Sequence, residues 1–161
     1  MKKVLLINGP YLNKTGTREP EIYGTQTMDD IVAEVRKRGE ELGIAVDYFQ
    51  SDSETELVIR IWEARGLYGG IIINPGVFTH AGTHIRDTLL RTGIPTVEVH
   101  LSNVFARESF RHVSMTAGAC LGQIAGFKGF GYVLALEALE KNEELGTGTD
   151  EERNGHGKAS G

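Results

Sequence analysis

The chain has 161 residues, of which 40% are hydrophobic and 24% charged, and its formal net charge is −5 at pH 7. These values fit one packed domain and exclude wholesale disorder. The acidic balance argues against a nucleic-acid binder, since such proteins carry a basic face. The single cysteine cannot form an internal disulfide, and no apolar run approaches the roughly 20 residues of a membrane span. We therefore expect a cytoplasmic protein that binds neither nucleic acid nor membrane.

The first half of the chain alternates between aliphatic runs and amphipathic stretches. Residues 4–7 predict a buried strand, and residues 9–26, rich in glycine and proline, predict a loop much longer than the usual 4–6 or so residues. Long loops of this kind often serve as lids or binding loops. The next predicted elements are a helix between the N-cap Thr27 and Gly43, a strand over residues 44–49, and a helix from the capping-box sequence at residues 53–56 to about Arg65, with Leu57, Ile61 and Trp62 facing inward.

The second half continues this alternation. We expect strands over residues 70–74, 94–99 and 120–127, the last of which buries Cys120, and helices over residues 83–91 and 132–145. From Gly146 the sequence is polar and glycine-rich without aromatic residues, which is typical of a mobile tail. The chain is thus expected to form one α/β domain over residues 1–145, followed by a tail over residues 146–161.

Strands that alternate with helices predict a doubly wound, five-stranded parallel sheet with helices on both faces, a three-layer α/β/α fold. Ligands of such sheets bind beyond the carboxyl ends of the strands, where the strand order reverses. Polar residues follow three predicted strand ends: Asn8 and the long loop follow the first, residues 74–80 the third, and residues 98–103 the fourth. We therefore expect a small-molecule site at this edge of the sheet.

The pair Glu98 and His100 is the strongest candidate for chemistry at this edge. The two residues are two positions apart on a strand and so share one face. A carboxylate beside an imidazole can fix its tautomer and favour its protonated form, which suits a general acid. A structural pair at a strand end is an equally good interpretation of the same spacing. Nearby hydrogen-bonding groups for a small oxygenated anion are Asn74, His80, Ser102 and Arg111, with Arg18 and Tyr23 in the long loop.

Other kinds of site are less well supported. Residues 8–15 end in Lys-Thr like a phosphate-binding loop, but Asn8 and Asn13 stand where that loop needs glycine. His80 and His84 have a spacing found in metal sites, yet no third ligand is obvious, and one histidine at a helix start beside a solvated one is the simpler interpretation. We expect neither a metal nor a cofactor.

Seven stretches of the chain resemble one enzyme family, type II 3-dehydroquinate dehydratase. They are NGPxLN (8–13), TREPEIYG (17–24), FQSDSE (49–54), NPGVFTH (74–80), IRD (85–87), EVHLSNVFARESFRH (98–112) and GFGYVLAL (129–136). The resemblance runs in order from residue 3 to about residue 140. It implies a flavodoxin-like fold, in agreement with the predicted sheet, and a homododecamer built from trimers.

The resemblance also implies a reaction. It is the dehydration of 3-dehydroquinate to 3-dehydroshikimate, without metal or cofactor, by anti elimination through an enolate. This step serves the shikimate pathway of aromatic amino acid biosynthesis as well as quinate catabolism. By the same resemblance, Tyr23 is the phenolate base with Arg18 beside it, and His100 is the general acid oriented by Glu98. The substrate carboxylate would bind Asn74, Ser102 and the N–H of Leu101, the ring hydroxyls would bind His80 and Arg111, and Asp87 would reach the site of a neighbouring subunit.

The sequence departs from the family pattern near the predicted pocket. Tyr11 stands where the family usually has asparagine, Ala81 and Gly82 replace a usual Thr-Ser, and His84 replaces a small residue. We expect all four positions to lie around the pocket. The chain is then either an ordinary dehydroquinase or a paralogue that acts on a different cyclic polyhydroxy ketone or acid. A third possibility is a small-molecule-binding protein without activity.

Overall fold

The computed structural model of the chain describes residues 2–17, 19–23 and 25–146. Arg18 and residues 147–161, which include nearly all of the predicted tail, lie outside the described residues, as does the side chain of Tyr23. The described residues form a five-stranded sheet in the order β2-β1-β3-β4-β5 with every neighbouring pair parallel. The strands are β1 (Lys3–Asn8), β2 (Ala45–Gln50), β3 (Gly70–Asn74), β4 (Thr96–His100) and β5 (Gly122–Ala125). The predicted doubly wound parallel sheet is therefore confirmed.

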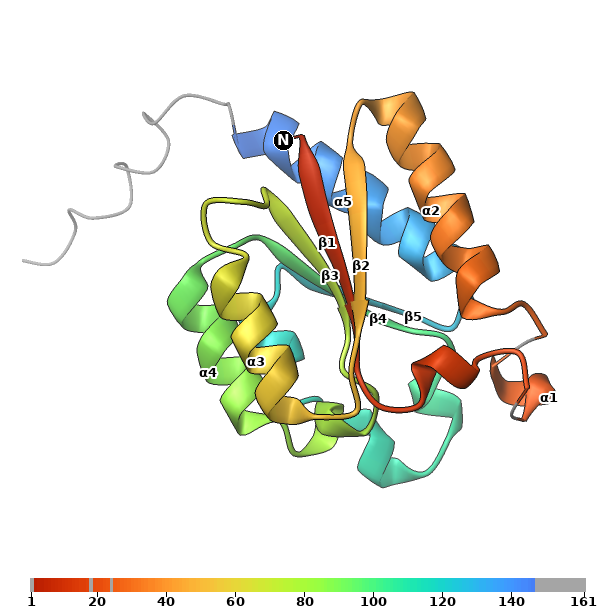
Figure 1. Cartoon of the computed structure of the whole chain (residues 1–161). Helices are drawn as coiled ribbons and strands as arrows, with labels where there is room; N and C mark the ends of the chain where they lie inside the picture. The colour runs from red at the N-terminus through yellow and green to blue at the C-terminus, as the bar shows by residue number, and fades with distance from the viewer. Residues whose placement is uncertain (1, 18, 24, 147–161) are drawn as a thin grey trace, which may run out of the picture.

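Helices cover both faces of the sheet, as Figure 1 shows. One layer contains α2 (Met28–Leu42) and α5 (Phe130–Gly146), and the opposite layer contains α3 (Glu54–Glu63) and α4 (Thr83–Thr92). The predicted long loop after β1 contains two short helical turns, η1 (Leu12–Lys14) and α1 (Pro20–Tyr23). Four further 3-10 turns lie between the later elements: η2 (Gly76–His80), η3 (Val104–Ala106), η4 (Ser109–His112) and η5 (Ala117–Ala119).

Strands β1 and β3 carry aliphatic side chains over residues 4–7 and 71–73, because both of their faces are buried. Along β1, Val4 and Leu6 pack in the cluster with α2 and α5, whereas Leu5 and Ile7 pack in the cluster with α3 and α4. All four side chains have no exposed surface. The alternation of side chains along a strand thus divides one short aliphatic run between two hydrophobic cores.

The helix ends follow the predicted caps with one difference. Thr27 caps α2 by accepting from the Asp30 N–H, and the Asp30 carboxylate accepts from the Thr27 N–H, so a complete capping box forms. Ser53 caps α3 by accepting from the Glu56 N–H, but the Glu56 carboxylate binds the Ser51 hydroxyl instead of returning to Ser53. The predicted capping box at α3 is therefore only half formed.

Two sequence-based predictions, one on a helix and one at the end of the last strand, are wrong. Trp62 was expected to face inward, but it is 42% exposed, and the Arg65 guanidinium lies 3.4 Å from the centroid of its ring. Cys120 was expected inside the last strand, but β5 begins two residues later, because pairing with β4 starts at Val97 opposite Gly122. Cys120 instead follows η5, and its thiol donates to the Thr116 carbonyl.

Candidate active site

A cavity of about 250 Å³ lies at the carboxyl edge of the sheet, as the strand ends predicted. It adjoins the ends of β1, β3 and β4, and the strand order reverses between β1 and β3. Gly9 lets the chain segments after β1 and β3 approach one another, because a side chain there would overlap the Pro75 carbonyl. The predicted site residues that line the cavity are Asn74, His80, His100, Leu101, Ser102 and Arg111.

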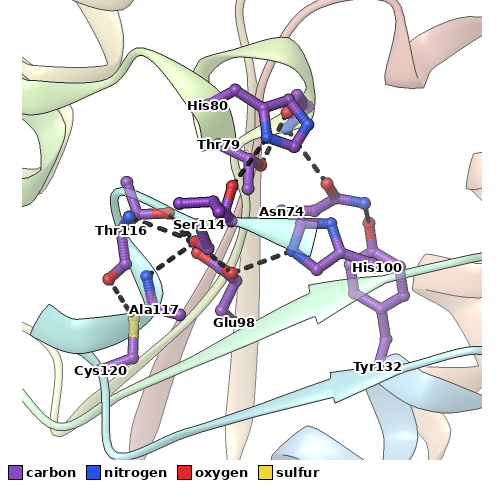
Figure 2. A network of polar contacts seen from close by, with 12 residues as sticks. Asn74, Thr79, His80, Glu98, His100, Ser114, Thr116, Ala117, Cys120 and Tyr132 are labelled. Atoms are coloured by element: carbon purple, nitrogen blue, oxygen red, sulfur yellow. Dashed lines mark hydrogen bonds and ion pairs between the residues drawn. The ribbon is translucent and has the colours of Figure 1, made fainter. Parts of the chain in front are cut away.

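Glu98 and His100 form a buried pair on β4. His100 Nε2 donates to Glu98 Oε2 over 2.9 Å, and Glu98 has no exposed surface. His100 is 9% exposed and lines the cavity. In Figure 2 the opposite edge of the imidazole ring faces the side on which Asn74 and His80 lie. Because Glu98 binds Nε2, it is Nδ1 that is left to exchange a proton with a ligand.

The Glu98 carboxylate has two further donors that the sequence did not point to. Ser114 Oγ donates to Glu98 Oε2 over 2.9 Å, and Thr116 Oγ1 donates to Oε1. Three donors thus bind this buried carboxylate and hold both of its oxygens in place. Burial, together with the charge of Glu98, raises the pKa of the Cys120 thiol to about 12.

The Asn74 amide is oriented by partners on both of its ends. Its Oδ1 accepts from the Gly76 N–H over 3.1 Å, and its Nδ2 donates to Tyr132 Oη over 3.0 Å. The backbone partner fixes which end of the amide is the oxygen. Nδ2 carries a second hydrogen for which the described residues provide no acceptor, so Asn74 can donate into the cavity that it lines.

Two arginines bring positive charge to the cavity. Arg111 Nε donates to Glu108 Oε2 over 2.7 Å, and Arg107 Nη1 donates to Ser102 Oγ over 3.3 Å. Both arginines line the cavity, and guanidinium groups suit an anionic ligand. Arg107 has no role predicted from the sequence, although it lies inside the longest of the family-like stretches.

His80 lines the same cavity from the end of η2. Its Nδ1 donates to the Val113 carbonyl over 2.9 Å, so Nε2 is its remaining polar atom. The ring also meets Phe110 edge to face, with 5.9 Å between the ring centroids. These contacts hold the ring in one orientation without using the nitrogen that a ligand would need.

Asp87 lies apart from this group. It is on α4, where its carboxylate accepts from Arg91 over 2.8 Å, and it does not line the cavity. Tyr23 is the last residue of α1, and Arg18 belongs to the undescribed residues. The roles expected for Tyr23, Arg18 and Asp87 thus remain predictions.

Of the four departures from the family pattern, Tyr11 lines this cavity and the other three do not. Tyr11 lines the cavity in the left-handed backbone region, with φ of 64°, and its N–H donates to Asp52. Ala81, Gly82 and His84 do not line the cavity, because the chain turns away from it into α4 after His80. Any side chain at Gly82 would collide with the Phe78 carbonyl.

Two kinds of feature are absent from the described residues. No three histidine, cysteine, aspartate or glutamate side chains there are grouped so that they could hold a metal ion. His80 and His84 belong to different elements, η2 and α4. No helix in the same part of the chain is long and apolar enough to cross a membrane.

The strand order is that of flavodoxin-like sheets, and the cavity lies where α/β proteins of this class bind their ligands, at the reversal of the strand order. Within that class, the family model described as dehydroquinase class II matches residues 2–140. The chain belongs to the class II dehydroquinase family.

Similar proteins support this assignment over most of the chain. A protein of Bacillus cytotoxicus named 3-dehydroquinate dehydratase is 51% identical over 139 residues, covering 86% of this chain and 95% of that protein. The crystal structure of a type II dehydroquinase from Propionibacterium acnes matches with a TM-score of 0.83 and 42% identity, over 88% of this chain and 97% of that one. The type II dehydroquinase of Butyrivibrio crossotus matches with a TM-score of 0.84 and 41% identity, over 86% and 97%.

Proposed function

We propose that this protein is a hydro-lyase that dehydrates 3-dehydroquinate to 3-dehydroshikimate. The observation that carries the proposal is the buried Glu98–His100 pair, which opens into a cavity at the carboxyl edge of a flavodoxin-like sheet. Membership of the dehydroquinase family and the high identity to proteins named 3-dehydroquinate dehydratase support the choice of substrate. The cavity volume of about 250 Å³ suits a small ring acid better than a drug-sized ligand.

In the proposed mechanism, two groups divide the proton transfers between them. The Tyr23 phenolate removes the proton alpha to the ketone, and the electron pair moves into an enolate. The enolate then collapses to the conjugated enone while the C1 hydroxyl leaves, and protonated His100 supplies the proton that turns it into water. A free tyrosine titrates near pH 10, so the base needs a nearby positive charge such as that of Arg18 to favour its phenolate form.

The geometry of β4 suits the part proposed for His100. Glu98 binds Nε2, which leaves the proton on Nδ1 for the leaving hydroxyl, and the negative charge of Glu98 favours the imidazolium that donates it. The pair is nearly closed to water, so this attraction is screened less than it would be at the surface. After donation, the neutral ring keeps its hydrogen on Nε2 and returns to its starting state by taking a proton from solvent.

The proposed substrate contacts divide by chemistry. The carboxylate of 3-dehydroquinate would accept from Asn74 Nδ2, the Ser102 hydroxyl and the Leu101 N–H. The ring hydroxyls would bind His80 Nε2 and the Arg111 guanidinium. All five residues line the cavity, and the positive charge of Arg107 adds to the attraction for an anionic ring.

Conversion of 3-dehydroquinate by the purified protein tests the proposal. The conjugated enone of 3-dehydroshikimate absorbs in the ultraviolet, so product can be followed continuously. We expect turnover by the wild type and by His84→Ala, which removes an exposed histidine outside the cavity lining. We expect a loss of about 100-fold or more in kcat for His100→Ala, the usual contribution of a general acid. Absence of turnover by folded wild-type protein would refute the proposal.

Tyr11 favours a second candidate, a paralogue that acts on another cyclic polyhydroxy ketone or acid. Its side chain lines the cavity at a position where the family usually has asparagine. A phenol there either donates a hydrogen bond to the ligand or fills space that a water would occupy. A panel of related ring acids, assayed by deuterium exchange alpha to the carbonyl, distinguishes the two candidates. A better substrate than 3-dehydroquinate would favour the paralogue.

We also propose that the chain forms a homo-oligomer in which Asp87 reaches a neighbouring site. Asp87 lies outside its own cavity, on a half-exposed stretch of α4. Light scattering of the purified chain gives the mass of the assembly. If the chain is monomeric and active, Asp87 has no such role.

A further inference from the structure

We propose that Ser114 and Thr116 are positioning residues for the reaction, which hold the Glu98 carboxylate so that Glu98 in turn orients His100. This inference rests on the proposed function, because it takes His100 to be the general acid. It concerns two hydroxyl groups that do not line the cavity and lie in a segment without regular structure between η4 and η5.

The two hydroxyls take up both oxygens of the Glu98 carboxylate. Thr116 Oγ1 donates to Oε1, while Ser114 Oγ shares Oε2 with His100 Nε2, each over 2.9 Å. Figure 2 shows this network, with the carboxylate between the hydroxyls on one side and the imidazole on the other. A carboxylate held on both oxygens cannot rotate about its terminal bond without breaking a hydrogen bond, so the position of the acceptor for His100 is fixed.

The backbone around Ser114 determines which way its hydroxyl points. Ser114 Oγ accepts from the Thr116 N–H over 3.2 Å and from the Ala117 N–H over 2.9 Å. Because both lone pairs of the oxygen are occupied, its single hydrogen is left for an acceptor, and Glu98 Oε2 is the acceptor with a formal charge. The same oxygen lies 3.2 Å from Thr116 Oγ1, so the two hydroxyl groups are in direct contact.

The burial of this network makes the hydroxyls important. Glu98 and Thr116 have no exposed surface, so water cannot replace a lost hydrogen bond. Without the hydroxyls, the imidazole would be the sole donor to the buried carboxylate, which could then turn about its terminal bond. His100 would then be held less firmly in the orientation that donates to the leaving group. The hydroxyls therefore act on the acid step through Glu98 and leave the base untouched.

Thr116→Val tests the inference, because valine keeps the shape of threonine and removes the hydroxyl. We expect kcat for 3-dehydroquinate to fall by about 10- to 100-fold with KM changed less than about 3-fold, since a general acid contributes about 10²–10⁴ and only part of that is lost. Deuterium exchange alpha to the ketone should fall much less than turnover, so the ratio of exchange to turnover rises. A merely structural role would lower both rates together. Thr116→Ser, which keeps the hydroxyl, should restore kcat to within about 3-fold of wild type.

Thr96→Val is the matched control. Like Thr116, Thr96 is a buried threonine. It lies on β4, and its hydroxyl donates to the Ile94 carbonyl rather than to Glu98. If Thr116→Val fails to fold, Ser114→Cys provides the same test, because a thiol is a weak donor of nearly the same shape. The inference is overturned if wild type turns over 3-dehydroquinate while Thr116→Val, or Ser114→Cys in its place, matches Thr96→Val in kcat and in exchange ratio. If wild type itself does not turn over 3-dehydroquinate, the proposed function fails first, and with it the basis of this inference.

Discussion

Tyr132 and Asn8 lie 124 residues apart in the chain, and a buried hydrogen bond of 2.8 Å from Tyr132 Oη to Asn8 Oδ1 joins them. The same hydroxyl accepts from Asn74 Nδ2, so one side chain of α5 bridges the carboxyl ends of β1 and β3. Burial raises the pKa of the Tyr132 phenol far above its ordinary value, which keeps the hydroxyl protonated and able to donate. Tyr132 thereby ties together the ends of the two strands between which the strand order reverses.

Removing this bridge should destabilise the protein. Tyr132→Phe leaves the Asn8 and Asn74 amides short of one partner each in a fully buried place, so we expect a loss of about 1–3 kcal/mol in the free energy of unfolding. Tyr48→Phe is the comparison: Tyr48 Oη is buried close to Asn8, but its geometry fits no hydrogen bond among the described residues, so its removal should cost less. Urea denaturation measures both. Equal effects of the two substitutions would contradict the role of the bridge.

Tyr11 should carry a conformational cost. Its φ of 64° lies in the left-handed region, which asparagine tolerates better than an aromatic residue does. Relief of this strain in Tyr11→Asn is therefore expected to raise the free energy of unfolding by about 1 kcal/mol. Loss of the packing of the ring would reduce this gain. Tyr11→Ala separates these effects, because it removes the ring and keeps the strain. If alanine stabilises as much as asparagine does, backbone strain at Tyr11 is not the cause.

Cys120 should be a slow thiol in the folded protein. Because burial and the charge of Glu98 raise its pKa to about 12, little thiolate exists at pH 8, and the thiolate is the reactive form. We expect alkylation by iodoacetamide at pH 8 to be more than ~100-fold slower in native than in urea-unfolded protein, where a cysteine titrates near 8.5 or so. The chain has a single cysteine, so mass spectrometry follows this site alone. Comparable rates in the two states would show that the thiol is not shielded.

Asp47 should make stability depend on pH in the acid range. Hydrogen bonds from Tyr68 and Lys3 lower the pKa of its carboxyl in the folded state. A depressed carboxyl pKa stabilises the fold above the unfolded value of about 3.9, and this contribution is lost as pH falls through the folded value. Asp47→Asn should thus be less stable than wild type at pH 7 by a fraction of a kcal/mol, since solvent screens the half-exposed pair with Lys3.

The difference between wild type and Asp47→Asn should shrink in urea melts below about pH 4, where the carboxyl of the unfolded chain is protonated. Glu63→Gln is the control, because the described residues give Glu63 no partner, and it should show no such trend. A difference that persists unchanged at pH 3 would mean that ionisation of Asp47 is not involved.

The fold could be predicted because its signals are local. Strands β1 and β3 are each a short run of aliphatic residues followed by an asparagine, and the run Val4 to Ile7 alone indicates that both faces of the sheet are covered. The site residues Asn74 and His100 could be found because each ends a strand, and carboxyl ends of parallel strands share one edge. These conclusions need no knowledge of how distant segments pack.

Ser114 and Thr116 could not be predicted in the same way. They reach Glu98 across 16 and 18 residues of turns that have no periodicity, so nothing local marks them. Trp62 was misassigned because helical spacing indicates a face, whereas the width of the buried stripe depends on the neighbouring helix. The length of β5 was overestimated because its partner β4 ends at His100, a limit set by pairing rather than by the apolar run.

Deuterium exchange and turnover, measured together in D₂O for two variants, most directly test the proposal that Tyr23 is the base and His100 the general acid. His100→Ala should still exchange the proton alpha to the ketone of 3-dehydroquinate, because Tyr23 forms the enolate, while product formation falls by about 100-fold or more. Tyr23→Phe should lose both exchange and turnover. If Tyr23→Phe exchanges normally, or if His100→Ala forms product at a rate near that of wild type, the assignment of base and acid is contradicted.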